Sequence, residues 1–284
     1  MQSRPWIRFL LWGAGAVLVL ALAFMFLFRS DEVLAPRPTG FDPGAFLAGR
    51  PSLDAPQVAT GMAVVDAMLS LAEVRPDDYV VDLGSGDGRI LIAAARSAGA
   101  HGLGVDIDPA AIETAGANAR AAGVTRLVAF RNQDLFETPL AEADVLTLYL
   151  TPEVNLRLRP RILAQMRPGA RVVSHDYTMG EWRWDRRQRV GEANVYVWIV
   201  PARIEGAWTL TANGRAFPLA IDQSFQTFTG TAGETRTEQG RISGDRIRFI
   251  ANLGRGRQVF EGRLDGNAIV PVDASERWRA VRAS

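Results

Sequence analysis

Short apolar runs alternate with segments of helical periodicity over residues 58–202. In the first helical segment, from Thr60 to Glu73, apolar residues recur at the spacing of one helix face. This alternation predicts a mostly parallel sheet covered by helices on both faces. The predicted strands are 79–83, 102–107, 127–130, 143–150 and 170–175, followed by an antiparallel pair at 187–190 and 195–200.

Start and stop signals indicate where two of the helices begin and end. Asp108 can cap a helix that starts at Pro109, and Gly123 stands where that helix is expected to end. The helix after the fourth strand is expected to be interrupted at Pro160, because proline lacks the amide that a helix interior needs. It should stop before Arg167-Pro168-Gly169.

The composition changes after Ala202, where glycine-bounded short strands replace helical periodicity. Gly240–Ile247 and Gly262–Ile269 form a loose repeat, and their Ser-Gly-Asp and Asp-Gly-Asn centres are typical of hairpin turns. Residues 203–284 are therefore expected to form a small antiparallel β domain, a sandwich or a barrel. Trp208 and Trp278 are interpreted as part of its core.

An uncharged apolar stretch from Phe9 to Phe28 is long enough to span a bilayer as a helix. Tryptophans lie near one end, where their rings favour the membrane interface. Together, these features predict a transmembrane anchor over residues 6–28. A cleaved signal peptide is the alternative, but the apolar run continues past Ala21-Leu22-Ala23, which resembles a cleavage site. Residues 29–57, rich in proline and glycine, are expected to be a linker to the 58–202 domain.

The composition excludes several classes of site. The chain has 32 basic and 31 acidic residues and no basic run, which argues against a nucleic-acid partner. It has no cysteine, so disulfides, thiolate ligands and a cysteine nucleophile are excluded. Its only histidines, His101 and His175, are far apart in the sequence, and no metal site is expected.

A glycine-rich turn follows the first predicted strand. After Asp82, glycines stand at every second position, Gly84, Gly86 and Gly88, and the pattern then becomes helical. So little side-chain bulk lets a ligand lie against bare backbone. A carboxylate beside it disfavours a phosphate but favours an ammonium or sulfonium group. A dinucleotide fingerprint would need a third glycine where Arg89 stands, while a turn without any ligand is the simplest alternative.

Two further acidic residues follow the second and third strands. In an open α/β sheet, ligands bind at the carboxyl ends of the strands, so Asp106 and Asp134 should lie beside Asp82 and Tyr149 around one crevice. A carboxylate at Asp106 can accept from both hydroxyls of a ribose. Asp134 can accept from an exocyclic amine. Each of the two could instead be an ordinary turn or solvated aspartate.

The Asp82-Leu-Gly-Ser-Gly-Asp-Gly-Arg sequence resembles the first motif of the class I S-adenosylmethionine (SAM) dependent methyltransferases. Together with Asp134-Leu-Phe and Thr147-Leu-Tyr-Leu-Thr-Pro-Glu, it resembles bacterial relatives of small membrane-anchored lysine methyltransferases. The eukaryotic members modify the ATP synthase c subunit and the adenine nucleotide translocase of mitochondria. The resemblance covers residues 56 to 200 and implies a Rossmann-like sheet. The cofactor-binding residues it implies are Asp82, Gly84, Ser85, Gly86, Gly88, Asp106, Ile107, Asp134 and Leu135.

Candidate acceptor residues follow the fourth and fifth strands. Tyr149, Thr151 and Glu153 occupy the segment where many relatives place acceptor-binding residues. His175 is the histidine with a plausible role as a base, although a lone histidine at a strand end is more often structural. Tyr149, Glu153 and His175 are the predicted catalytic residues.

Two other sequence features bear on the acceptor. The chain lacks the Asn-Pro-Pro-Tyr motif of amide and base methylators, which counts against those substrates. Trp182 and Trp184 either line an acceptor channel or cover the sheet, and the sequence leaves both options open.

The expected function is SAM-dependent methyl transfer to a membrane-associated acceptor, with a protein lysine favoured. The alternatives are a methyltransferase for a lipid or another small molecule, and a non-catalytic, membrane-tethered nucleotide-binding module. Arginines flank both ends of the apolar stretch, so charge does not determine its orientation. Because SAM is cytosolic, we expect a single-pass protein of the bacterial inner membrane whose catalytic domain faces the cytoplasm.

Overall fold

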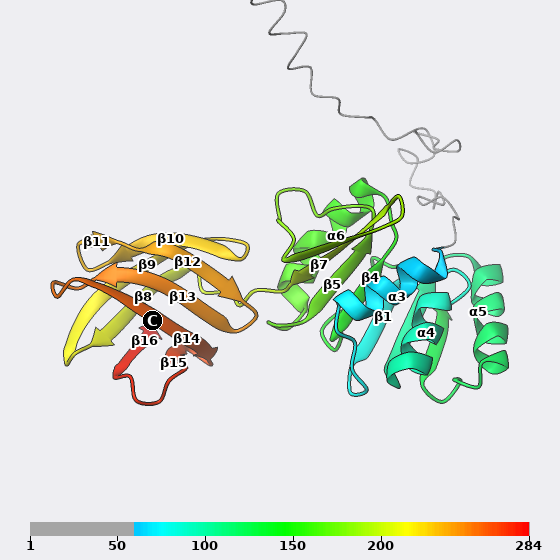
Figure 1. The fold of residues 1–284 in the computed structure, drawn as a ribbon, viewed down its shortest axis with the longest axis horizontal. Helices are drawn as coiled ribbons and strands as arrows, with labels where there is room; N and C mark the ends of the chain where they lie inside the picture. The colour runs from blue at the N-terminus through cyan, green and yellow to red at the C-terminus, as the bar shows by residue number, and fades with distance from the viewer. Residues whose placement is uncertain (1–59, 284) are drawn as a thin grey trace, which may run out of the picture.

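The computed structural model describes residues 60–283, so the predicted anchor at 6–28 and linker at 29–57 lie outside the described residues. The described chain forms two bodies side by side: a sheet covered by helices, and an all-β body (Figure 1). No helix within residues 60–283 is long and apolar enough to cross a membrane.

The first body is a seven-stranded sheet in the order β3-β2-β1-β4-β5-β7-β6. Strands β1 to β5 are parallel, and β7 runs antiparallel to both of its neighbours. The predicted Rossmann-like sheet, mostly parallel with an antiparallel last strand along the chain, is thereby confirmed, although β7 lies between β5 and the edge strand β6. The strands are β1 (Tyr79–Leu83), β2 (His101–Asp106), β3 (Val128–Asn132), β4 (Val145–Leu148), β5 (Arg171–His175), β6 (Arg186–Val190) and β7 (Ala193–Ile199).

Three helices cover one face of this sheet and one helix covers the other. Buried residues of α3 (Met62–Leu71), α4 (Arg89–Ala98) and α5 (Pro109–Ala121) share one hydrophobic cluster with the strands. Helix α6 (Pro152–Gln165) contributes to the cluster on the opposite face. Both faces of the sheet are therefore buried under helices, as is typical of parallel sheets.

The predicted helix signals are correct at α5, and the predicted stop of α6 before Arg167 is also correct, since the helix ends at Gln165; only the expected interruption of α6 is wrong. Asp108 accepts a hydrogen bond from Ala110 N at 2.9 Å, which caps α5 ahead of Pro109. Helix α6 continues through Pro160 without the expected interruption. Pro160 and Leu156 are both exposed, so water can bond to the carbonyl that proline leaves without a helical partner.

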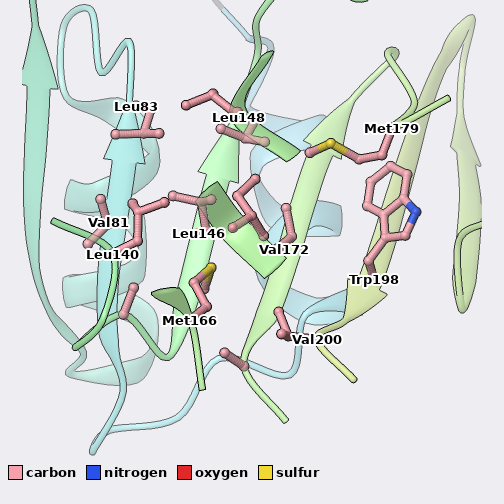
Figure 2. Packing of buried hydrophobic residues seen from close by; sticks show 14 of the residues in the cluster. Val81, Leu83, Leu140, Leu146, Leu148, Met166, Val172, Met179, Trp198 and Val200 are labelled. Atoms are coloured by element: carbon pink, nitrogen blue, oxygen red, sulfur yellow. The ribbon is translucent and has the colours of Figure 1, made fainter. Parts of the chain in front are cut away.

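The α6 face holds a continuous hydrophobic layer. Figure 2 shows Leu83, Leu146 and Leu148 from the central strands in the same layer as Trp198 of β7. Trp182 is fully buried in this cluster, and its ring lies 6.0 Å from that of Trp198. Trp182 therefore covers the sheet, which decides between the two options that the sequence left open for it.

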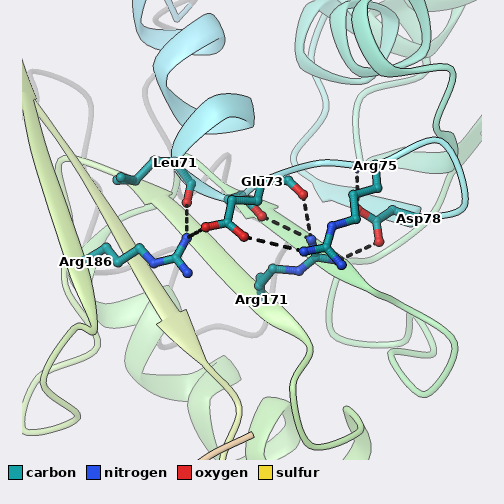
Figure 3. Close-up of polar contacts among 7 residues, drawn as sticks. Leu71, Glu73, Arg75, Asp78, Arg171 and Arg186 are labelled. Atoms are coloured by element: carbon teal, nitrogen blue, oxygen red, sulfur yellow. Dashed lines mark hydrogen bonds and ion pairs between the residues drawn. The ribbon is translucent and has the colours of Figure 1, made fainter.

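Ion pairs tie the end of α3 to the sheet (Figure 3). Arg171, the first residue of β5, pairs with Asp78 at 2.6 Å and donates to the carbonyl of Glu73 at 2.9 Å. The carboxylate of Glu73 pairs with Arg186 of β6 and Arg75. These contacts lie at the amino ends of the strands. At the other end of α3, Thr60 reaches His175 at the carboxyl end of β5.

The second body is a nine-stranded antiparallel sheet that closes on itself, because β9 also pairs with β10. Trp208 and Trp278 are buried in its core, as the sequence predicted for the two residues. The predicted β domain is thus a barrel. Its strands are β8 (Gly206–Ala212), β9 (Arg215–Ser224), β10 (Thr227–Ala232), β11 (Thr235–Arg236), β12 (Glu238–Ser243), β13 (Arg246–Asn252), β14 (Arg257–Asp265), β15 (Ala268–Pro271) and β16 (Trp278–Arg282).

The turn between β9 and β10 joins the two bodies. Phe225 stacks on Trp182 with ring centroids 6.2 Å apart, and the Arg159 guanidinium of α6 lies 5.3 Å from the Phe225 ring. The side-chain amide of Gln226 donates to the carbonyl of Arg183 at 2.5 Å. A cavity of about 610 Å³ beside this contact is lined by residues of both bodies, including Trp184.

Candidate active site

Asp82 lies at the centre of the sheet, near the carboxyl end of β1, with a side chain that is almost fully buried. Its Oδ1 accepts a hydrogen bond from the hydroxyl of Thr147 on β4. Its Oδ2 is buried and has no hydrogen-bond partner among the described residues. Burial raises the pKa of Asp82 to about 7, and the negative charges of Asp106 and Asp87 add to this effect. The site therefore holds a carboxylate that needs a cation or a proton.

The glycine turn folds next to this carboxylate. Gly84, Gly86 and Gly88 all have positive φ, at 79°, 52° and 78°. A Cβ on Gly86 would meet no atom within 4 Å, so this backbone borders open space. A Cβ on Gly88 would lie 2.6 Å from Cζ of Phe130. Gly86 thus leaves room for a ligand, whereas Gly88 allows the turn to pack on β3.

Asp106, at the end of β2, is oriented by two backbone amides. Gly86 N donates to its Oδ2 at 2.9 Å, and Asp108 N donates to its Oδ1 at 3.0 Å. Each carboxylate oxygen keeps further acceptor capacity, so both can accept from a pair of vicinal hydroxyls. The arrangement fits the predicted ribose contact and links that contact to the glycine turn.

The loop after β3 lies beside the end of β2. The side-chain amide of Asn132 donates to the carbonyls of Asp106 and Ile107 at 3.0 and 2.8 Å. Ile107 is 42% exposed, which is unusual for a large apolar side chain and fits a surface that a flat ring covers. Asp134 accepts from Phe136 N at 2.7 Å and is exposed, and Leu135 is half-buried beside it.

The residues brought together at this edge fit SAM. Oδ2 of Asp82 and the buried hydroxyl of Ser85, both without a hydrogen-bond partner among residues 60–283, provide polar partners for the charged end of the cofactor. Asp106 would hold the ribose, and the Ile107 and Asp134 segments would flank the adenine. When bound, SAM supplies an activated methyl group. No group of metal-ligating side chains is present among residues 60–283.

A second cluster lies where β4 and β5 end. The rings of Tyr149 and His175 stack with centroids 3.9 Å apart, and Tyr177 lies 6.4 Å from Tyr149. His175 is buried, with Nδ1 3.3 Å from the Thr60 hydroxyl and Nε2 3.3 Å from Asp176 Oδ2. Two of the predicted catalytic residues, Tyr149 and His175, are thus in contact.

The third predicted catalytic residue, Glu153, is exposed in the first turn of α6, and the structure does not place it in the cluster. Thr151 precedes α6 and makes no side-chain capping bond. Sequence reasoning missed Thr60, Thr147 and the buried Asn155, whose side-chain oxygen has no partner among the described residues. Thr147 stands in the motif quoted above, whereas Thr60 has no local signal.

The sheet topology, the glycine turn and the two carboxylates define a class I SAM-dependent methyltransferase. The model of the ANTKMT methyltransferase domain matches residues 82–186. A protein-lysine N-methyltransferase from Saccharolobus islandicus is 37% identical over 150 residues, which cover 51% of this chain and 93% of that protein. Because this relative is covered almost completely, the chain belongs to the family of the ANTKMT methyltransferase domain.

Two other relatives extend the comparison. The adenine nucleotide translocase lysine N-methyltransferase of Mus musculus is 33% identical over 146 residues, which cover 51% of this chain and 62% of the mouse protein. The crystal structure of an RNA methyltransferase from Salinibacter ruber with S-adenosylhomocysteine has 52% sequence identity and a TM-score of 0.51. It covers 52% of this chain and 96% of that one. The chain is therefore an enzyme with SAM as its cofactor, and the non-catalytic alternative is excluded.

Proposed function

We propose that this enzyme transfers the methyl group of SAM to a lysine side chain of a membrane-associated protein. The observation that carries this proposal is the 37% identity to an archaeal protein-lysine N-methyltransferase over almost all of that protein. The mouse relative, which acts on the lysine of a translocase, supports the same acceptor chemistry.

The second cluster suits an amine acceptor. A lysine ammonium has a reference pKa of about 10.4, so it must lose a proton before its nitrogen can attack the methyl carbon. Burial lowers the pKa of His175, although Asp176 opposes this effect, so the imidazole can be neutral and able to accept a proton. The aromatic face of Tyr149, against the same imidazole, provides a surface that attracts an amine cation.

The membrane part of the proposal rests on the sequence of residues 6–28. A single anchor there would keep the enzyme at the bacterial inner membrane and restrict it to acceptors within reach of the linker. The catalytic domain would face the cytoplasm, where SAM is available.

The test is incubation of the purified full-length protein with methyl-labelled SAM and membranes from a strain that lacks its gene. Label on lysine of a membrane protein supports the proposal. If the membranes are then separated from the soluble material and the enzyme is found in the soluble fraction, the predicted anchor is contradicted. Label confined to the organic-soluble lipid fraction would instead support the small-molecule alternative.

RNA is the second candidate acceptor, because the Salinibacter ruber structure with 52% identity is that of an RNA methyltransferase. Against RNA stand the near balance of 32 basic and 31 acidic residues and the lack of an Asn-Pro-Pro-Tyr motif. Adding total RNA from the same strain to the labelling reaction distinguishes the two, since ribonuclease would release the label from RNA only.

A further inference from the structure

His175 connects two residues that are far apart in the sequence. Its Nδ1 lies 3.3 Å from the hydroxyl of Thr60, and its Nε2 lies 3.3 Å from Oδ2 of Asp176. With the proton on Nε2, the ring donates to Asp176 and accepts from Thr60, so this tautomer satisfies both contacts. The three side chains form one line of hydrogen bonds beside Tyr149.

Hydrogen bonds that involve backbone atoms fix both ends of this line, at Asp176 and at Thr60. Asp176 adopts a φ of 61°, and Asn194 N donates to its Oδ1 at 2.7 Å. Asp176 N in turn donates to the carbonyl of Asn194 at 2.7 Å. At the other end, Arg89 donates to the carbonyl of Thr60 at 2.7 Å. Aspartate adopts this left-handed conformation more readily than most residues, and the two bonds to Asn194 hold its carboxylate in this orientation.

We propose that Thr60 is a catalytic residue that relays a proton from the incoming amine to His175, and that Asp176 is a positioning residue that holds the imidazole as the final proton acceptor. This rests on the proposed lysine acceptor. The ammonium gives a proton to the Thr60 oxygen while the Thr60 hydroxyl gives its own proton to Nδ1. The imidazole becomes an imidazolium paired with Asp176, and the neutral amine keeps its electron pair for attack on the methyl carbon. S-adenosylhomocysteine then leaves with the electrons of the broken sulfur–carbon bond.

The charges around the ring suit this role. Asp176 faces Nε2 from the segment after β5 and stabilises the imidazolium. Tyr149 stacks on the imidazole, and Tyr177 stacks on Tyr149. Burial raises the pKa of Tyr149, so its phenol stays neutral. The guanidinium of Arg89 is paired with Asp87 at 2.6 Å, which reduces its repulsion of a protonated His175.

The test compares variants of the full-length enzyme with membrane proteins of the gene-deleted strain as acceptors. Thr60→Val removes the hydroxyl at nearly constant volume, Thr60→Ser retains it as the matched control, and Asp176→Asn removes only the charge. At pH 7, Thr60→Val and Asp176→Asn should lower kcat about 10-fold or more, with the KM for SAM unchanged. Thr60→Ser should stay within about threefold of wild type.

The pH profile separates proton transfer from a structural role. As the pH approaches the lysine value of about 10.4, solvent deprotonates the amine, and the deficits of Thr60→Val and Asp176→Asn should nearly disappear. Equal deficits at every pH, or loss in Thr60→Ser as large as in Thr60→Val, would overturn the proposal. If Thr60→Val does not fold, Asp176→Asn alone decides. Wild type that labels no lysine overturns the acceptor assignment itself, whereas labelled lysine with pH-independent deficits overturns only the relay.

Discussion

The hydroxyl of Thr147 donates to one carboxylate oxygen of Asp82, and the other oxygen is buried without a partner among the described residues. An unpaired carboxylate of this kind is unfavourable in the free enzyme. A cofactor that carries ammonium and sulfonium charge supplies what it lacks. Cofactor affinity and protein stability are therefore linked through one side chain.

The affinity for SAM should fall as the pH decreases through about 7, the pKa of Asp82 in the free protein. A proton competes with the cation for the carboxylate, so affinity should drop about tenfold between pH 8 and pH 6. Isothermal titration calorimetry across this range measures it. Asp82→Asn is the control, because it removes this dependence and leaves only the titration of the cofactor's own amine. An equally steep profile in Asp82→Asn would contradict the prediction.

The stability of the cofactor-free enzyme should depend on pH in the opposite direction and decrease as the pH rises. The folded-state pKa of Asp82 is raised from 3.8 to about 7, so the folded state binds more protons than the unfolded state between these values. Its contribution to stability is present below about pH 4 and is lost as the pH rises through 7. Asp82→Asn should therefore raise the Tm at pH 8 more than at pH 5. A lower Tm for this variant at pH 8 would show that the carboxylate is not a source of instability.

Asp106→Ala should weaken SAM binding roughly 10- to 100-fold, since hydrogen bonds to a charged group are worth about 1.5–3 kcal/mol. The loss has two parts: the ribose loses its acceptor, and Gly86 N loses the partner that orients the glycine turn. Asp108→Ala is the matched control, because Asp108 caps α5 through Ala110 N. If Asp108→Ala weakened binding as much as Asp106→Ala, the ribose assignment would be wrong.

The sequence was sufficient for features that depend on local order. Alternating apolar segments predicted the sheet, and the spacing after Asp82 predicted the glycine turn. The contact of Thr60 with His175 spans 115 residues, and no local pattern encodes it. The sequence around Phe225 indicates only a turn, and its contact with Trp182 could not be predicted because Trp182 belongs to the other body. At Pro160 the general rule failed, since solvent exposure relieves the lost hydrogen bond.

Gly88→Ala should destabilise the first body by about 2–4 kcal/mol. The new Cβ would lie 2.6 Å from Phe130 Cζ, and the φ of 78° disfavours any side chain. Gly99→Ala is the matched control at the other end of α4: its φ is 73°, but its Cβ would meet no atom within 4 Å. It should cost only about 1–2 kcal/mol. Urea denaturation measures both, and equal losses would show that contact with Phe130 is not what requires a glycine at position 88.

Phe225→Ala should loosen the barrel from the methyltransferase body without unfolding either one. The half-buried ring contacts Trp182 and Arg159, and its loss should cost about 1–2 kcal/mol of docking free energy. That corresponds to a rise of roughly 5- to 30-fold in the undocked fraction. Trypsin cleavage after the exposed Arg203, between the bodies, should accelerate accordingly, as followed by mass spectrometry.

The control for docking is Phe217→Ala, which removes an aromatic ring that packs within the barrel and lies beside Arg215. It should leave the rate of cleavage after Arg203 unchanged. Neither variant should alter SAM affinity, because neither residue belongs to the cofactor-binding set. If Phe225→Ala and Phe217→Ala accelerated cleavage equally, general destabilisation of the barrel would explain the effect. If both variants were cleaved after Arg203 as slowly as the wild type, the hydrogen bond from Gln226 to the Arg183 carbonyl would be sufficient to hold the bodies together without Phe225.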